Sequence, residues 1–186
     1  MLVIAMVGII AALAIYGVSR QVASSRTAES KDKIRLICEA AVKTYVQDRT
    51  RDVNVLLPGA FSQMKNRVLC GSSSWVPDDL TKVKSCKKYQ PNSAEGQDFN
   101  TGDWLNGWRC LHFDISDPIH YRYNYSLNDG DWSGTISGAG APAWFVARAE
   151  GDLNGNGVPS RFLRGGVVEN DEVRVTSALW VENETD

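Results

Sequence analysis

The segment Asp152-Leu-Asn-Gly-Asn-Gly157 carries a side-chain oxygen at every second residue, which is the spacing of a calcium-binding loop. Asp152, Asn154 and Asn156 would be the metal ligands. An EF-hand also needs a bidentate glutamate at its twelfth position, where this chain has Leu163. Two neutral ligands and no such glutamate would make calcium binding weak, so the simpler interpretation is a glycine-rich β-turn. We expect no other cofactor.

The histidines, His112 and His120, are the other candidates for chemistry. His112 alternates with Asp114 and Ser116, which would place three catalytic side-chain types on one face of a strand. A catalytic triad instead needs side chains that converge from different elements, together with an oxyanion hole. The polar face of a strand therefore explains the pattern better. Since G-x-S-x-G, P-loop and H-E-x-x-H motifs are also missing from the sequence, we expect no catalytic residues and no enzyme activity.

Four cysteines, Cys38, Cys70, Cys86 and Cys110, allow three disulfide pairings in an exported domain. Cys70 and Cys86 flank a loop of glycine, serine and proline, so we expect this local pair. Cys38 would then pair with Cys110, or both would be free buried thiols, because free cysteine packs as a small hydrophobe. The spacing of the four residues does not match a zinc motif.

A group of large apolar residues lies between Asn100 and Phe113. Its members are Trp104, Leu105, Trp108, Leu111 and Phe113. Their spacing suits a short helix or turn that enters a strand. Their simplest role is to anchor the core under the loops, and an aromatic platform for a sugar is the alternative.

The first eighteen residues contain no charged side chain. A helix of about 20 apolar residues crosses a bilayer core, and roughly 17 is the lower limit. We therefore expect residues 1–18 to form a transmembrane or filament-core helix. The flanking residues do not resemble those of a typical secretory signal peptide, because no basic residue precedes the segment and no clean Ala-x-Ala site follows it.

Apolar residues then recur at three- and four-residue intervals, with charged residues such as Lys31 and Arg35 between them. The stripe includes Ile34, Ile37, Ala41 and Tyr45. This pattern predicts an amphipathic helix over residues 19–50 that continues the first segment and buries one face. The remaining residues, 51–186, are enough for one globular domain.

Strand patterns dominate the second half of the chain. Residues 119–127 alternate between apolar and polar side chains, and the turn signal Asn128-Asp-Gly-Asp131 follows. Further strands are expected at residues 132–137, 144–149, 161–168 and 172–181. Short connections between consecutive strands favour an antiparallel arrangement. The predicted fold class is α+β, with a long N-terminal helix packed on an antiparallel β-meander.

Residues Val3 to Ile15 resemble the N-terminal helix of type IV pilins and of the pseudopilins of type II secretion. Residues 117–123 and 147–157, in this order, resemble globular domains of pilin-like proteins from some Gram-negative bacteria. The resemblance implies a pilin-like fold and a helix that leaves the inner membrane for the filament core on assembly. Pseudopilins with bound calcium keep a calcium site at the Asp152 loop as an alternative.

The start of the chain departs from this family. A leader, a glycine cleavage site, a phenylalanine and a glutamate would precede the helix in the family, and Tyr16-Gly17 stands where many members have a proline. We expect the natural start to lie upstream of Met1, with an N-methylated phenylalanine. The alternative is a subunit that lacks the glutamate and depends on helix packing alone.

The resemblance implies a structural subunit of a type IV pilus (a fimbrium) or of a type II secretion pseudopilus. Domain size favours a minor pilin. Its partners would be other pilin subunits, the inner membrane before assembly and the assembly machinery, with the globular domain outside the cytoplasm and later in a cell-surface filament. A net charge of −2 without a basic run gives no reason to expect nucleic-acid binding. The alternative function is a membrane-anchored or secreted binding module, for which a flexible linker near residues 19–30 would be expected.

Overall fold

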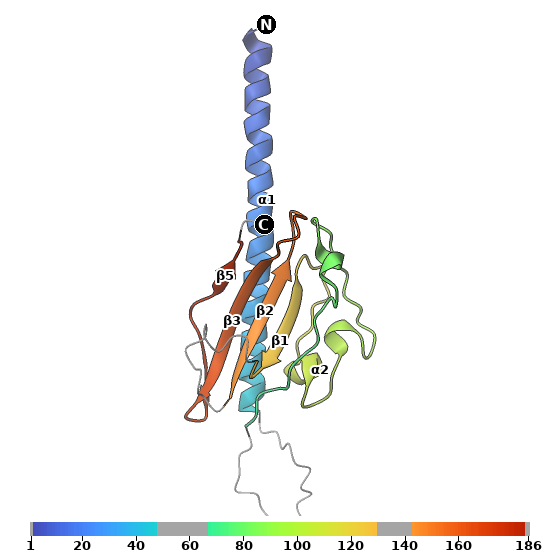
Figure 1. Cartoon of the computed structure of the whole chain (residues 1–186), viewed down its shortest axis with the longest axis vertical. Helices are drawn as coiled ribbons and strands as arrows, with labels where there is room; N and C mark the ends of the chain where they lie inside the picture. The colour runs from blue at the N-terminus through green and yellow to red at the C-terminus, as the bar shows by residue number, and fades with distance from the viewer. Residues whose placement is uncertain (1, 48–66, 130–142, 185–186) are drawn as a thin grey trace, which may run out of the picture.

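The computed structural model describes residues 2–47, 67–129 and 143–184, and side chains over residues 2–23 only in part. Helix α1 spans Leu2–Val46, and its C-terminal part lies against one face of a sheet while its N-terminal part projects beyond it (Figure 1). When only the described residues are considered, no helix is both long and apolar enough to cross a membrane.

The sheet contains five antiparallel strands. They are β1 (Arg122–Leu127), β2 (Trp144–Gly151), β3 (Ser160–Glu169), β4 (Glu172–Val175) and β5 (Trp180–Glu182). β2 pairs with β1 and β3, while β4 and β5 follow one another along the second edge of β3. The predicted edge strand at 172–181 is thus split: Thr176 donates through its N–H to the carbonyl of Gly165, and the chain leaves the edge until Trp180.

The amphipathic stripe of α1 forms one side of the core. Ile34 and Ile37 are 0% exposed and Ala41 is 1% exposed, whereas the side chains of Lys31 and Arg35 stay 39% and 48% exposed. The predicted buried and exposed faces are therefore confirmed. On the opposing sheet face, the rings of Tyr121, Tyr123 and Tyr125 are fully buried.

The predicted fold class, a pilin-like α+β fold with a long N-terminal helix packed on an antiparallel β-meander, is wrong. The part of α1 that packs on the sheet is short, because its buried side chains run only from Thr27 to Tyr45. Strand length explains the difference. The ten residues of β3 extend about 33 Å at 3.3 Å per residue, whereas the 45 residues of α1 extend about 68 Å, so the sheet covers about half of the helix.

The prediction of a half-buried strand at residues 119–127 is correct for one face only. His120, Asn124 and Ser126, on the face expected to be polar, are also buried. The segment before η1 (Leu80–Val83) runs along the free edge of β1, where Asn124 donates to the carbonyl of Ser73 at 2.8 Å. Asn124 thus finds its partner in a loop that the periodicity does not reveal, whereas His120 lies 2.9 Å from the carboxylate of Glu29 on α1.

The return strand predicted at 132–137 lies outside the described residues. The predicted helix or turn between residues 100 and 113 is present as α2 (Gly107–Leu111), preceded by η2 (Asp98–Asn100).

The packing of α1 on the sheet makes Ile37 a sensitive position. Ile37→Asp should lower the free energy of unfolding by roughly 3 kcal/mol or more, because it places an unpaired charge in the core. Thermal unfolding of the full chain in detergent should show a matching fall in Tm. Ala28→Asp, on the exposed face of the same helix, is the control and should change stability by no more than about 0.5 kcal/mol. Equal effects of the two substitutions would contradict this packing.

Candidate functional site

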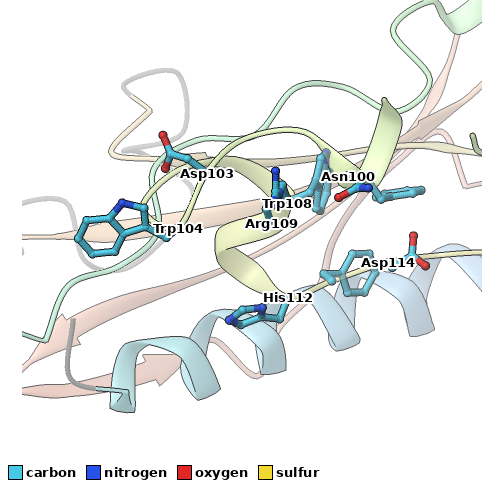
Figure 2. Close-up of a pocket in the computed structure, with 9 residues that line it drawn as sticks. Asn100, Asp103, Trp104, Trp108, Arg109, His112 and Asp114 are labelled. Atoms are coloured by element: carbon cyan, nitrogen blue, oxygen red, sulfur yellow. The ribbon is translucent and has the colours of Figure 1, made fainter. Parts of the chain in front are cut away.

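The described residues form a pocket of about 380 Å³ beside α2, which we call the α2 pocket (Figure 2). It is lined by Phe99, Asn100, Asp103, Trp104, Trp108, Arg109, His112, Phe113 and Asp114. All nine come from the stretch that begins at η2 and ends just after α2. One local segment therefore supplies the whole pocket.

Three aromatic rings form the floor of the α2 pocket. Phe99 meets Trp108 edge-on at 5.0 Å between centroids and Phe113 edge-on at 5.8 Å, while Trp108 and Phe113 lie 5.6 Å apart. Trp108 is fully buried and its indole N–H donates to the carbonyl of Ser74 at 3.0 Å. These interactions hold the floor in one arrangement, since edge-to-face pairs and a satisfied indole each favour a defined geometry.

A tight turn presents Trp104 at one end of the pocket. The carboxylate of Asp103 accepts hydrogen bonds from the N–H groups of Leu105 at 2.7 Å and Asn106 at 2.8 Å. Gly102 lies at a φ of +99°, and a Cβ there would come within 2.1 Å of the Asn106 carbonyl oxygen, so the turn requires glycine. Trp104 is 52% exposed at the tip of this turn.

Polar side chains line the rim. Arg109 donates to Glu95 at 3.3 Å. His112 ends α2 with a φ of +50°, and both it and Asp114 are exposed. Within the described part of the chain, neither of these two side chains has a hydrogen-bond or ion-pair partner. The rim thus offers a ring nitrogen and a carboxylate to an incoming molecule.

The expected strand through His112, Asp114 and Ser116 is not present. His112 adopts the left-handed conformation that terminates a helix, and the residues after it are irregular. No strand forms there, although His112, Asp114 and Ser116 are exposed in alternation with the buried Phe113 and Ile115. Sequence reasoning also overlooked Asn100, Asp103 and Arg109, although the run Gly102-Asp-Trp-Leu-Asn-Gly107 signals a tight turn whose tip would expose a tryptophan.

The cysteine pairing predicted from the sequence is wrong. Cys70 is bonded to Cys110 with 5.8 Å between their Cα atoms, and Cys38 and Cys86 are free. The reason is that Cys86 lies instead beside the Asp152 loop, where its thiol contacts the Leu153 carbonyl at 3.1 Å. Cys38 is buried in the helix stripe, and that burial raises its pKa to about 12.

In the Asp152 loop, the three candidate ligands accept hydrogen bonds from the loop backbone. Asp152 is 1% exposed, and its carboxylate accepts from the N–H groups of Gly155 at 2.8 Å and Gly157 at 3.0 Å, with the Lys84 ammonium 3.4 Å away. Asn154 and Asn156 each accept from the N–H two residues further on. Across the described residues, no group of three His, Cys, Asp or Glu side chains could hold a metal ion. The weak calcium site stays a prediction.

No family model matches this chain, and neither a curated protein nor a solved structure shows significant similarity to it.

The free cysteines should differ sharply in reactivity. Iodoacetamide at pH 8 should label the exposed Cys86 of the folded chain and leave Cys38 unlabelled, because the thiolate is the nucleophile and burial suppresses its formation.

Peptide mapping without reductant should show Cys70 joined to Cys110. Replacing both of these cysteines by serine should cost about 4 kcal/mol, from the entropy of a loop of this length. A peptide that links Cys70 to Cys86 would contradict the structure.

Asp152 should contribute strongly to stability. Asp152→Ala removes the buried carboxylate that accepts from the N–H groups of Gly155 and Gly157 and should cost about 2 to 3 kcal/mol, measured by denaturant unfolding. Asn156→Ala removes one exposed acceptor and is the control, at about 1 kcal/mol or less.

Calcium should bind to the Asp152 loop with a Kd of about 10⁻⁴ to 10⁻³ M if it binds. A micromolar Kd in calorimetry that Asp152→Ala abolishes would overturn this interpretation.

Proposed function

We propose that the protein is a filament subunit of the type IV pilus or type II secretion pseudopilus kind, a minor pilin that assembles through the N-terminal part of α1. The observation that carries the proposal is the exposure of apolar side chains on this segment. Val7, Leu13 and Val18 are 61%, 68% and 63% exposed, and residues 1–18 contain no charge.

An apolar helix surface of this kind needs a partner, because contiguous exposed apolar surface marks a protein or membrane contact. The segment lies on the part of α1 that projects beyond the domain (Figure 1). Lipid would cover it before assembly, and the same segment of neighbouring subunits would cover it afterwards. Small residues in the segment, such as Gly8 and Ala11, would let helices approach closely.

The continuity of α1 supports this proposal over a tethered binding module, and the disulfide is consistent with both functions. Helix α1 runs without a break through residues 19–30, where a tether would need a flexible linker. The Cys70–Cys110 disulfide fits an oxidising compartment, and so a globular domain outside the cytoplasm. A structural role of this kind requires no catalytic group.

Assembly of the full chain tests the proposal. On removal of detergent, the purified protein should form assemblies that sediment, whereas Leu13→Lys should keep at least about tenfold more protein in the supernatant, because an unpaired charge in an apolar contact is strongly unfavourable. Val158→Lys is the matched control, since Val158 is 48% exposed on the globular domain, and it should assemble normally. Equal sedimentation of Leu13→Lys and the unaltered chain would refute the proposal, as would an unaltered chain that stays monomeric.

A further inference from the structure

We infer that the α2 pocket binds a neutral sugar ring, with the apolar face of the ring stacked on Trp104 and its hydroxyl groups bonded to the polar rim. This inference concerns the globular domain and does not rest on assembly through α1.

The first step is the position of Trp104. The core beneath it is already filled, because Trp108 is fully buried and Phe99 is 3% exposed. Trp104 thus stands 52% exposed on a turn that Asp103 and Gly102 fix in place. A large aromatic ring held at a rigid position can contact a ligand at little cost in conformational entropy.

The second step is the polar rim. Figure 2 shows the side chains of Trp104 and His112 directed toward the same end of the pocket, with Asp114 at the other end. An imidazole can donate to or accept from a hydroxyl group and a carboxylate accepts from one, and among the described residues these two side chains have no partner of their own. An aromatic face combined with such groups matches a pyranose, which has an apolar C–H face and a circle of hydroxyls.

Charge and size narrow the ligand further. Of the described lining residues, Arg109 is the cation that could attract an acidic group, and it already pairs with Glu95. Asp103 and Asp114 add negative charge, which disfavours nucleic acid and acidic sugars. A volume of about 380 Å³ lies at the lower end of the range of small-molecule sites. The site therefore suits one neutral ring, free or as part of a longer glycan.

Saturation-transfer NMR on the full chain, in a detergent without a sugar headgroup, tests the inference. The probes are the methyl β-glycosides of glucose, galactose and N-acetylglucosamine at millimolar concentration. At least one should receive saturation, concentrated on the C–H protons of one ring face. Trp104→Ala should weaken its binding by about tenfold or more and Trp104→Phe by less, while His112→Ala and Asp114→Asn should each weaken it measurably.

The controls separate binding from folding. Trp180→Ala removes a partly buried tryptophan of β5 and should leave sugar binding unchanged. The Tm of each variant shows whether it is folded, and if Trp104→Ala is not, the exposed His112 and Asp114 variants provide the same test. Binding of no probe, binding unaffected by Trp104→Ala in a folded protein, or a preference for methyl glucuronide or oligo-deoxythymidine would overturn the inference.

Discussion

The structure depends on the burial of one stripe of α1 against the tyrosine-bearing face of the sheet. Ile34, Ile37 and Ala41 on the helix are as completely buried as Tyr123 and Tyr125 on β1. Neither surface is stable in water alone, since each exposes a continuous apolar stripe. The contact has a polar cost, because the hydroxyls of both tyrosines are buried without a partner among the described residues, and burial raises the pKa of each. The tyrosine rings stay buried because the free energy gained by burying their apolar surface exceeds the cost of leaving each hydroxyl without a hydrogen bond. The ring of Tyr125, for example, stacks on Phe145 with 5.4 Å between the centroids.

The loops before β1 depend on this core and position the α2 pocket in turn. The Cys70–Cys110 disulfide ties α2 to the segment that runs along the edge of β1. Hydrogen bonds from Gly71 to Leu105 and from Gly107 to Gly71 hold the same two segments together. Trp108 then closes the floor through its bond to Ser74. The pocket is therefore built from loop residues and the short helix α2, but it is fixed to the sheet at several points and holds its shape without a long helix or strand.

The parts of the fold that local sequence patterns specify were predicted correctly. The stripe of α1 follows from its helical periodicity, whereas the strands predicted at 144–149 and 161–168 follow from the turn-rich sequences that bound them; β2 and β3 confirm both strands. The extent of helix–sheet packing does not follow, because it depends on the length of the strands relative to the helix. The cysteine pairing was also beyond local reasoning: Cys70 and Cys110 are 40 residues apart, and only the folded loops bring them together. In the candidate site, Trp104 and His112 were singled out from the sequence. The spacing of His112, Asp114 and Ser116 suggested a strand, whereas His112 in the structure has the left-handed conformation that ends α2 and directs its side chain to the rim.

Two exposed apolar features remain after the core has formed, and their physical differences suggest different partners. The N-terminal part of α1 is apolar, without charge and extended, so it suits a partner that is itself long and apolar, such as lipid or another copy of the helix. Trp104 is a single ring surrounded by hydrogen-bonding groups, so it suits a small partner with one apolar face and a polar edge. If a long apolar molecule covered the pocket, His112 and Asp114 would be buried without hydrogen-bond partners. Burying each unpaired polar group would cost free energy. The pocket is therefore unsuited to the partner of the helix, and the two surfaces can act at the same time because they lie on opposite parts of the molecule (Figure 1).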